Sequence, residues 1–212
     1  MLDIEALKAD WTKTIGKWCE DKVTIKYWVN YLVRQYSSSD RKYHTLKHVH
    51  FMLNLAYQNR CRVDNWLALY LAIWFHDAVQ NQSGQNEKFS AQKCTEAIND
   101  LGLPDSSREA NGLILATTNH DPDISNDAKL LMDLDLAILG SDSAEYEQYA
   151  RQCRAEFTVP NWLYRLGRAR VLNRFLKRKN IYMTRLFRAS LEKKARRNLR
   201  WELEIMKKGV SI

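Results

Sequence analysis

The sequence has few of the residues that punctuate turns or cross-link small folds. Its 212 residues include seven Gly and three Pro, too few for the closely spaced turns of a β-sandwich or barrel. The four cysteines lie far apart without a C-x-x-C pair, which argues against a cysteine zinc site or a disulfide framework and fits reduced thiols. No apolar run is long enough to cross a bilayer, and the first residues lack signal-peptide character, so we expect a cytoplasmic protein with no membrane partner.

Hydrophobic residues are plentiful and follow a helical period. They make up 45% of the chain, and aromatics make up 11%, enough for one sizeable packed domain. Apolar residues recur at steps of three and four, whereas alternation at period two is absent over any useful length. The run 66–75 is apolar on all sides, which predicts a buried central helix. The sequence therefore predicts an all-α protein, a single compact helical domain over residues 1–212.

Charge is distributed unevenly along the chain. Residues 151–212 hold 18 Lys and Arg against 4 Asp and Glu, a net charge of +14, and residues 1–150 hold 15 against 21, a net charge of −6. An acidic region suits a cation, and a basic region attracts an anion. We expect the basic C-terminal helices, about 151–212, to pack on the rest of the domain.

The five histidines can be examined one by one. His44 and His48 stand four residues apart, and on a helix this spacing places both imidazoles on one face. His50 points away from them, and we expect it to be a surface or half-buried residue. His120 follows a helix end, where it can interact with the helix dipole or reach a bound anion or a second metal.

His76 and Asp77 end the most hydrophobic run of the chain. A polar pair in that setting is costly unless something compensates it, and coordination of a divalent cation by imidazole and carboxylate would do so. The alternative is a helix end at which the apolar run reaches solvent, and for this dipeptide alone we favour the alternative.

Two further carboxylates, Asp133 and Asp135, interrupt a later apolar run. Two residues apart on a helix, they diverge by about 200°, so only one of them can face a given site. An aspartate in such a run is also commonly a structural hydrogen-bond acceptor. Glu87 opens another helix, where acidic residues are common in any case.

Together these residues follow the order H…HD…D, which resembles the HD superfamily of metal-dependent phosphohydrolases. The Y-H-x-x-x-H segment also resembles the histidine motif of the cyclic-nucleotide phosphodiesterases. A longer set of segments, spread from about Trp18 to Glu204, is similar to a bacterial-type family of predicted HD phosphohydrolases: Tyr43-His44 with His48, 74–79, Asn86-Glu87 with Ser90-Ala91, 133–140 and 195–199.

The resemblance implies an HD-type helical domain that hydrolyses a phosphate ester bond of a nucleotide or a similar small phosphorylated substrate, using a metal-activated water. It implies His48, His76, Asp77 and Asp135 as ligands of a divalent cation (Mn, Fe, Ni, Zn or Mg), with Asp133 as the alternative to Asp135. His44 matches the phosphodiesterase histidine that gives a proton to the leaving oxygen.

Other residues are weaker candidates on this interpretation. Asp77 could also orient or deprotonate the water. Glu87 and His120 are candidates for a second metal, a water or the phosphate. Arg41, Lys47, Lys88 and Arg168 are each candidates for binding substrate phosphate, and nothing in the sequence selects among them. Gln80 stands where the family commonly has an aromatic residue, which predicts a different substrate preference.

Two other interpretations compete with the enzyme. The basic region from Arg165 to Lys208, with interspersed Trp and Tyr, could bind nucleic acid or another anion. The simpler alternative for that region is a solvated helix face whose apolar stripe packs on the core, and we favour it because the leucines there demand burial. A degenerate HD fold used for interaction only is opposed by the retention of all four ligand types.

Overall fold

The computed structural model describes residues 2–80, 84–118 and 125–208. This described part is helical and contains no strand, so the all-α prediction is confirmed. The chain divides into two compact units, Met1–Leu131 and Met132–Ile212, and each is described by itself. The single-domain interpretation stays a prediction. Among the described helices, none combines the length and the hydropathy needed to span a bilayer.

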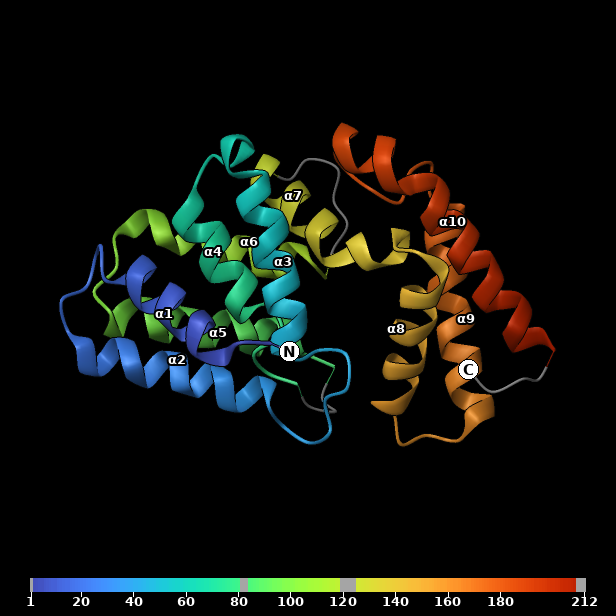
Figure 1. Ribbon diagram of the computed structural model, residues 1–212, viewed down its shortest axis with the longest axis horizontal. Coiled ribbons are helices and arrows are strands. Elements are labelled where there is room, and N and C mark those ends of the chain that lie inside the picture. The colour runs from blue at the N-terminus through green and yellow to red at the C-terminus, as the bar shows by residue number, and fades with distance from the viewer. Residues whose placement is uncertain (1, 81–83, 119–124, 209–212) are drawn as a thin grey trace. The chain divides into compact units, whose positions relative to one another are not determined.

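Unit 1 is built from helices α1 to α6 and the first part of α7 (Figure 1). Short 3-10 turns occur at Arg60–Arg62 and Asp105–Arg108. The helices are α1 (Ile4–Ile15), α2 (Lys22–Tyr36), α3 (Leu46–Gln58), α4 (Trp66–Phe75), α5 (Asn86–Asp100), α6 (Glu109–Ala116) and α7 (Asn126–Asp135), the last of which carries the boundary between the units.

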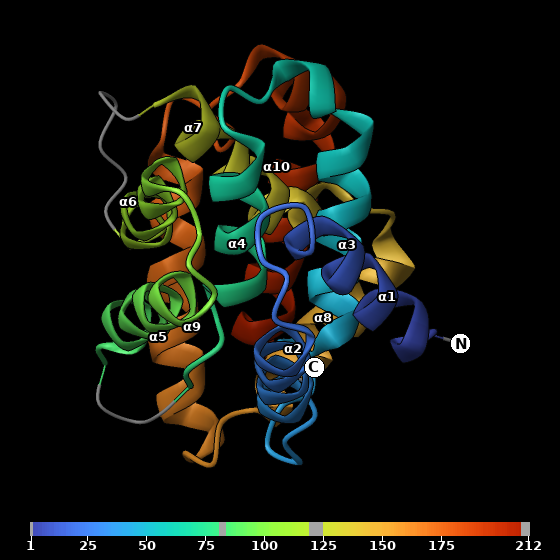
Figure 2. The ribbon, with the colours of Figure 1, turned by 90° about the vertical axis from the view of Figure 1, so that its left-hand side faces the viewer.

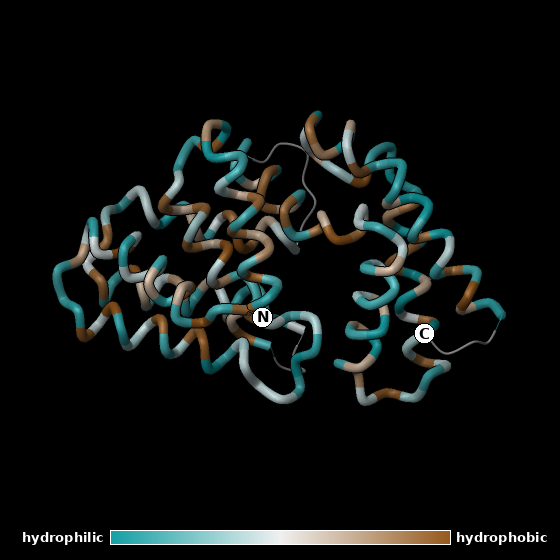
Figure 3. The backbone as a smooth tube through the Cα atoms, viewed as in Figure 1, coloured by the Kyte–Doolittle hydropathy of each residue, from teal (hydrophilic) through white to brown (hydrophobic). Residues whose placement is uncertain are grey.

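Helix α4 is the centre of unit 1 and has the bounds that the apolar run predicts. Every residue of α4 from Leu67 to Phe75 is buried, with α3 packed on one side and α5 and α6 on the other (Figure 2). The hydropathy colouring shows brown along this helix (Figure 3). Burying a large apolar side chain contributes about 1.5–3 kcal/mol, so α4 holds its C-terminal end in a fixed place. His76 and Asp77 follow at that end.

Capping residues fix where α3 and α4 begin. The Thr45 side chain accepts a hydrogen bond from the Lys47 backbone N–H (3.3 Å), and the Asn65 side chain accepts one from that of Ala68 (3.1 Å). Because Thr45 is the N-cap, α3 begins at Leu46, and the expectation that His44 lies on the same helix as His48 is wrong.

Unit 2 consists of the last part of α7, a 3-10 turn at Leu136–Gly140 and helices α8 (Ser143–Ala155), α9 (Asn161–Lys177) and α10 (Arg185–Lys207). Helix α10 packs against the turn, α9 and α8. At Gly140 a Cβ atom would lie 2.6 Å from the Cβ of Leu191, so the close approach of α10 requires glycine there. The interior holds an ion pair in which Arg168 donates to both carboxylate oxygens of Glu202 (2.8 and 3.1 Å).

Candidate metal centre

Two imidazoles and one carboxylate converge at the end of α4. The Nε2 atoms of His48, from α3, and His76 lie 3.3 Å apart, and the Nε2 atom of His76 lies 3.3 Å from a carboxylate oxygen of Asp77. One potential ligand atom from each of the three residues lies within 4.8 Å of the others. We call these three residues the HHD cluster. Its geometry brings together three of the four ligands implied by the resemblance.

The ring of His76 is fixed by its other nitrogen. Its Nδ1 atom lies 2.9 Å from the backbone carbonyl oxygen of Ile73, one turn earlier in α4. Because a carbonyl oxygen can only accept, the hydrogen of the neutral ring resides on Nδ1, and the lone pair on Nε2 points into the cluster. Metal-binding histidines commonly use a carbonyl partner in this way.

The separation of the two Nε2 atoms matches the edge of a coordination polyhedron. Two nitrogens bound to a metal at about 2.0–2.1 Å lie about 2.9 Å apart at an octahedral angle and about 3.4 Å apart at a tetrahedral angle. The observed 3.3 Å between His48 and His76 falls between these values. The donor set of two nitrogens and an oxygen therefore fits Zn, Fe, Mn or Ni better than Mg, which prefers oxygen ligands.

Asp77 remains a carboxylate in this setting. Burial raises the pKa of its carboxyl group, but the positive charge that the imidazoles of His76, His44 and His48 carry when protonated outweighs burial and holds the pKa well below its usual range. The side chain of Asp77 is 29% exposed, whereas that of His76 is 3% exposed. One side of the cluster is therefore open to solvent, so a water molecule or a small ligand can reach the carboxylate.

His44 lies beside the cluster although it precedes α3. Its Nε2 atom is 3.9 Å from the Asp77 carboxylate, and its ring centroid is 5.9 Å from that of His48. The side chain is 33% exposed. The neighbourhood inferred from the four-residue spacing is thus present, although it arises from the turn before α3 and not from one helix face.

Arg41 has a different place from the one predicted. The side chain is 6% exposed, and its guanidinium donates to the backbone carbonyls of His44 (3.0 Å), Asp77 (2.7 Å) and Ala78 (3.3 Å). It also lies over the Tyr36 ring, 4.9 Å from the centroid. A buried guanidinium engaged by three carbonyls does not fit the prediction of a substrate contact. Arg41 instead ties the turn before α3 to the segment after α4.

Helix α5 also holds the segment that follows α4, through a contact to Val79. Ser90 is fully buried, and its hydroxyl accepts a hydrogen bond from the backbone N–H of Val79 (3.0 Å). Sequence reasoning missed this role and that of Arg41. The only sequence signal for these two roles is proximity to the motif residues: Arg41 precedes His44 by three residues, and Ser90 lies within one of the motif segments. Glu87 lies half-buried in the first turn of α5, and its catalytic role stays a prediction.

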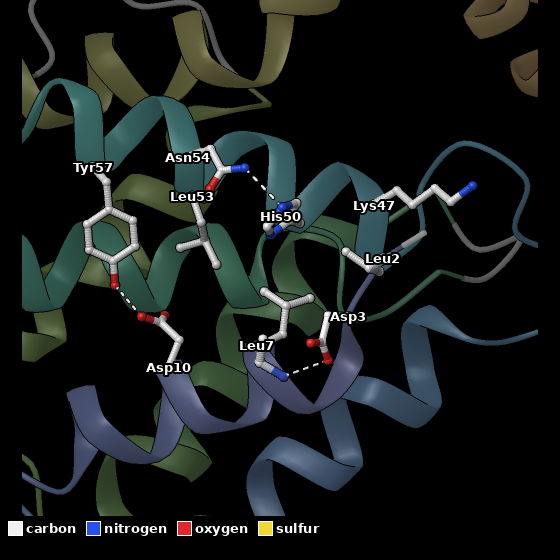
Figure 4. Close-up of a pocket in the computed structure, with 10 residues that line it drawn as sticks. Leu2, Asp3, Leu7, Asp10, Lys47, His50, Leu53, Asn54 and Tyr57 are labelled. Carbon is white, nitrogen blue, oxygen red and sulfur yellow. Dashed lines mark hydrogen bonds between the residues drawn. The ribbon is translucent and has the colours of Figure 1, made fainter.

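Lys47 and His50 belong to another surface of α3. Both line a cavity of about 560 Å³ whose walls are α1 and α3. In it the Tyr57 hydroxyl donates to Asp10 (2.7 Å), and the Asn54 amide pairs with the His50 ring (3.0 Å), while Lys47 extends away from that group (Figure 4). His50 is exposed, as expected. Since His48 does not line this cavity, Lys47 serves a different face of the helix from the HHD cluster.

The two late aspartates belong to unit 2. Asp133 is fully buried, and its carboxylate accepts hydrogen bonds from the backbone N–H groups of Met183 and Thr184 (2.7 Å each) and from the Thr184 hydroxyl (2.6 Å). These contacts hold the start of α10 and account for Asp133 as a structural acceptor. Asp135 is half-buried at the end of α7. Its assignment as a ligand stays a prediction.

Lys88 and Gln80 are exposed, whereas Arg168 is paired with Glu202 in the interior of unit 2, which removes it as a phosphate contact. His120 lies outside the described residues.

Comparisons with family models, with curated proteins and with solved structures find no match for this chain. The likeness to the HD superfamily therefore rests on the quoted motif residues. What the fold and the site define together is an all-α protein with a cluster suited to a metal ion.

Proposed function

We propose that this chain is a metal-dependent phosphohydrolase that acts on a nucleotide or a similar small phosphorylated substrate. The observation that carries the proposal is the pair of buried Nε2 atoms at 3.3 Å, joined by the partly open Asp77 carboxylate. Imidazole and carboxylate donors arranged in this way suit a divalent transition-metal cation. The motif order H…HD…D adds the reaction class and nominates Asp135 as a further ligand.

The cation, when bound, supplies Lewis acidity toward a phosphate oxygen and lowers the pKa of a water. His48 and His76 would hold it through Nε2, and the Ile73 carbonyl keeps the His76 ring from turning. Asp77 would stay ionised beside the positive charge of the cation, and it would orient or deprotonate the attacking water.

His44 is the proposed proton donor to the leaving oxygen. Its ring is a third exposed and lies beside the cluster, 3.9 Å from Asp77, which leaves it able to meet a substrate without being buried among the ligands. Arg41 does not contact substrate in this proposal. Its three carbonyl contacts fix the backbone of His44 and Asp77, so it is a positioning residue.

Metal analysis and an activity screen test the proposal together. The purified chain, supplied in turn with Mn, Fe, Ni, Zn and Mg, is assayed for bound metal and for hydrolysis of a chromogenic phosphodiester and a panel of nucleoside monophosphates. We expect bound transition metal and hydrolysis in the wild type. His76→Ala and Asp77→Ala should lose both.

His50→Ala is the matched control, because His50 lies on α3 two residues from His48 but faces another cavity. It should keep the metal and the activity. Equal metal content in His76→Ala and the wild type would overturn the metal centre. Metal that binds normally without hydrolysis of any phosphate ester would overturn the enzyme and leave the interaction-only alternative.

A further inference from the structure

Helix α9 in unit 2 has two unlike faces. Tyr164, Leu172 and Phe175 are buried, and they share a face with Arg168. If the first residue of the helix, Asn161, is left out, the exposed residues lie on one side of the helix, within an arc of about 140° at a turn of about 100° per residue. They are Trp162, Leu163, Leu166, Gly167, Arg170, Asn173, Arg174 and Lys177. The inward stripe buries Leu172 and Phe175, as expected, whereas Leu163 and Leu166 are exposed. Arg170, Arg174 and Lys177 lie on the side opposite the stripe.

The C-terminal half of this exposed face is a concentration of positive charge. Arg170, Arg174 and Lys177 continue into Arg178 and Lys179, and we call these five residues the α9 basic cluster. Within the described ranges, no carboxylate lies at ion-pair distance from any of them. Their charges therefore repel one another without local compensation.

Four other cations on the surface helices of unit 2 have acidic partners. Arg151 pairs with Glu147, Lys194 with Asp142 (2.8 Å), Arg196 with Glu192 (2.7 Å) and Lys207 with Glu204 (2.9 Å). The repulsion within the cluster is visible at Arg178, where burial lowers the pKa of the guanidinium and the charge of Arg174 lowers it further. An anionic partner would relieve this repulsion.

We propose that the α9 basic cluster, together with Trp162, binds single-stranded nucleic acid. Phosphates would lie along the cluster, where Lys and Arg release the counterions of a polyanion. Trp162 is 68% exposed and lies twelve residues before Arg174 on the same face, about 18 Å along the axis. An exposed indole at that separation offers a base a stacking surface beside the phosphate track.

The distribution of apolar residues disfavours a membrane surface as the partner. A helix that lies in a lipid interface buries an apolar stripe along its full length. On α9 the exposed apolar residues Trp162, Leu163 and Leu166 occupy only the N-terminal half, and the apolar residues further along are buried or half-buried. The exposed C-terminal half carries only Arg, Asn and Lys. This inference concerns unit 2 and does not depend on the proposed phosphohydrolase activity.

The test is fluorescence anisotropy of a labelled single-stranded RNA oligonucleotide titrated with the full chain at low and at physiological salt. The variant Arg170→Gln/Arg174→Gln/Lys177→Gln removes three cations of the cluster. The control Arg151→Gln/Lys194→Gln/Lys207→Gln removes the same charge from exposed cations that have acidic partners. Circular dichroism verifies that both variants remain helical.

We expect the cluster variant to bind at least tenfold more weakly and to reduce the salt slope by about 2, since each single-strand phosphate contact contributes about 0.7. Trp162→Ala should weaken binding by about tenfold without changing that slope. The control triple variant should bind like the wild type. Equal losses in the two triple variants would reduce the effect to net charge and overturn the site. Absence of wild-type binding at low salt, or binding to vesicles of anionic lipid in preference to RNA, would overturn the proposal as well.

Discussion

Each of the two units contains a cluster of buried polar groups. In unit 2 the groups of the cluster pair with one another as opposite charges, whereas in unit 1 the potential ligand atoms face a common point. In unit 2 the Glu202 carboxylate is fully buried and receives the guanidinium of Arg168 and the hydroxyl of Tyr146. In unit 1 two imidazole Nε2 atoms and a carboxylate oxygen face one another around a common point.

The difference separates a structural cluster from a candidate binding site. Opposite charges with matched hydrogen bonds satisfy each other, and such a cluster needs no further partner. Lone pairs that converge are satisfied by a cation or a proton placed between them. Burial alone therefore does not mark the site in unit 1. The orientation of the ligand atoms does.

Breaking the buried Arg168–Glu202 ion pair of unit 2 should give the largest loss of stability. Arg168→Met leaves the Glu202 carboxylate buried without its cation, and we expect about 3–5 kcal/mol of destabilisation in urea unfolding. Arg151→Met, at an exposed ion pair in α8, should change stability by about 0.5 kcal/mol or less. A loss at Arg168 no larger than at Arg151 would contradict the description of the unit 2 interior.

The two aspartates of α7 should separate structure from metal binding. Asp133→Asn weakens three hydrogen bonds at the start of α10, so we expect about 1–2 kcal/mol of destabilisation with unchanged metal content. Asp135→Asn should leave the stability unchanged and lower the metal affinity about 10-fold or more. Unfolding curves and metal titrations on both variants measure this. Unchanged affinity in Asp135→Asn would remove Asp135 from the proposed ligands.

Replacing Arg41 should distinguish positioning from substrate contact. Arg41→Gln loses the guanidinium contacts to the carbonyls of His44, Asp77 and Ala78, and we expect metal affinity to fall about 10-fold as the ligands lose their fixed backbone. Lys47→Gln is the control, since Lys47 lines the α1–α3 cavity. A rise in KM with unchanged metal affinity in Arg41→Gln would restore the interpretation of Arg41 as a phosphate contact.

The smallest expected effect concerns the α1–α3 cavity at high pH. Burial, with the Asp10 carboxylate beside it, raises the pKa of Tyr57 to about 12. Because the unfolded phenol titrates near pH 10, the contribution of Tyr57 to stability is intact below pH 10 and is lost as the pH rises toward 12. Difference absorbance of tyrosinate between the wild type and Tyr57→Phe should place its titration near pH 12, and Asp10→Asn should move it toward 10. Titration of Tyr57 near 10 in the wild type would contradict the hydrogen bond to Asp10.

Much of the fold could be predicted because it depends on local patterns. The apolar run of α4 gave its bounds, and Gly102, which has a φ of 59°, follows the C-cap of α5 in the left-handed conformation that commonly ends a helix. The start of α3 could not be predicted from the His44–His48 spacing, because the hydrogen bond of Thr45 decides it. Capping depends on one backbone rotation that periodicity does not encode.

The candidate ligands could be predicted from the sequence better than the residues that hold them in place. His48, His76 and Asp77 stand out in the sequence because polar groups interrupt apolar runs. Arg41 could not be assigned in the same way, because two of its three backbone carbonyl partners lie 36 and 37 residues away, and a charged residue near a histidine suggests phosphate first. The helical spacing left both Asp133 and Asp135 open and the resemblance favoured Asp135; the hydrogen bonds that Asp133 accepts at the start of α10 account for Asp133 as a structural residue.

The central claim is that His48 and His76 bind one cation through Nε2. X-ray absorption at the metal edge, on the chain loaded with one equivalent of Zn or Mn, measures this most directly. We predict two imidazole nitrogens at about 2.0–2.2 Å in the wild type, one in His48→Ala, and two in His50→Ala. Coordination by oxygen alone, or a histidine count unchanged in His48→Ala, would contradict the account.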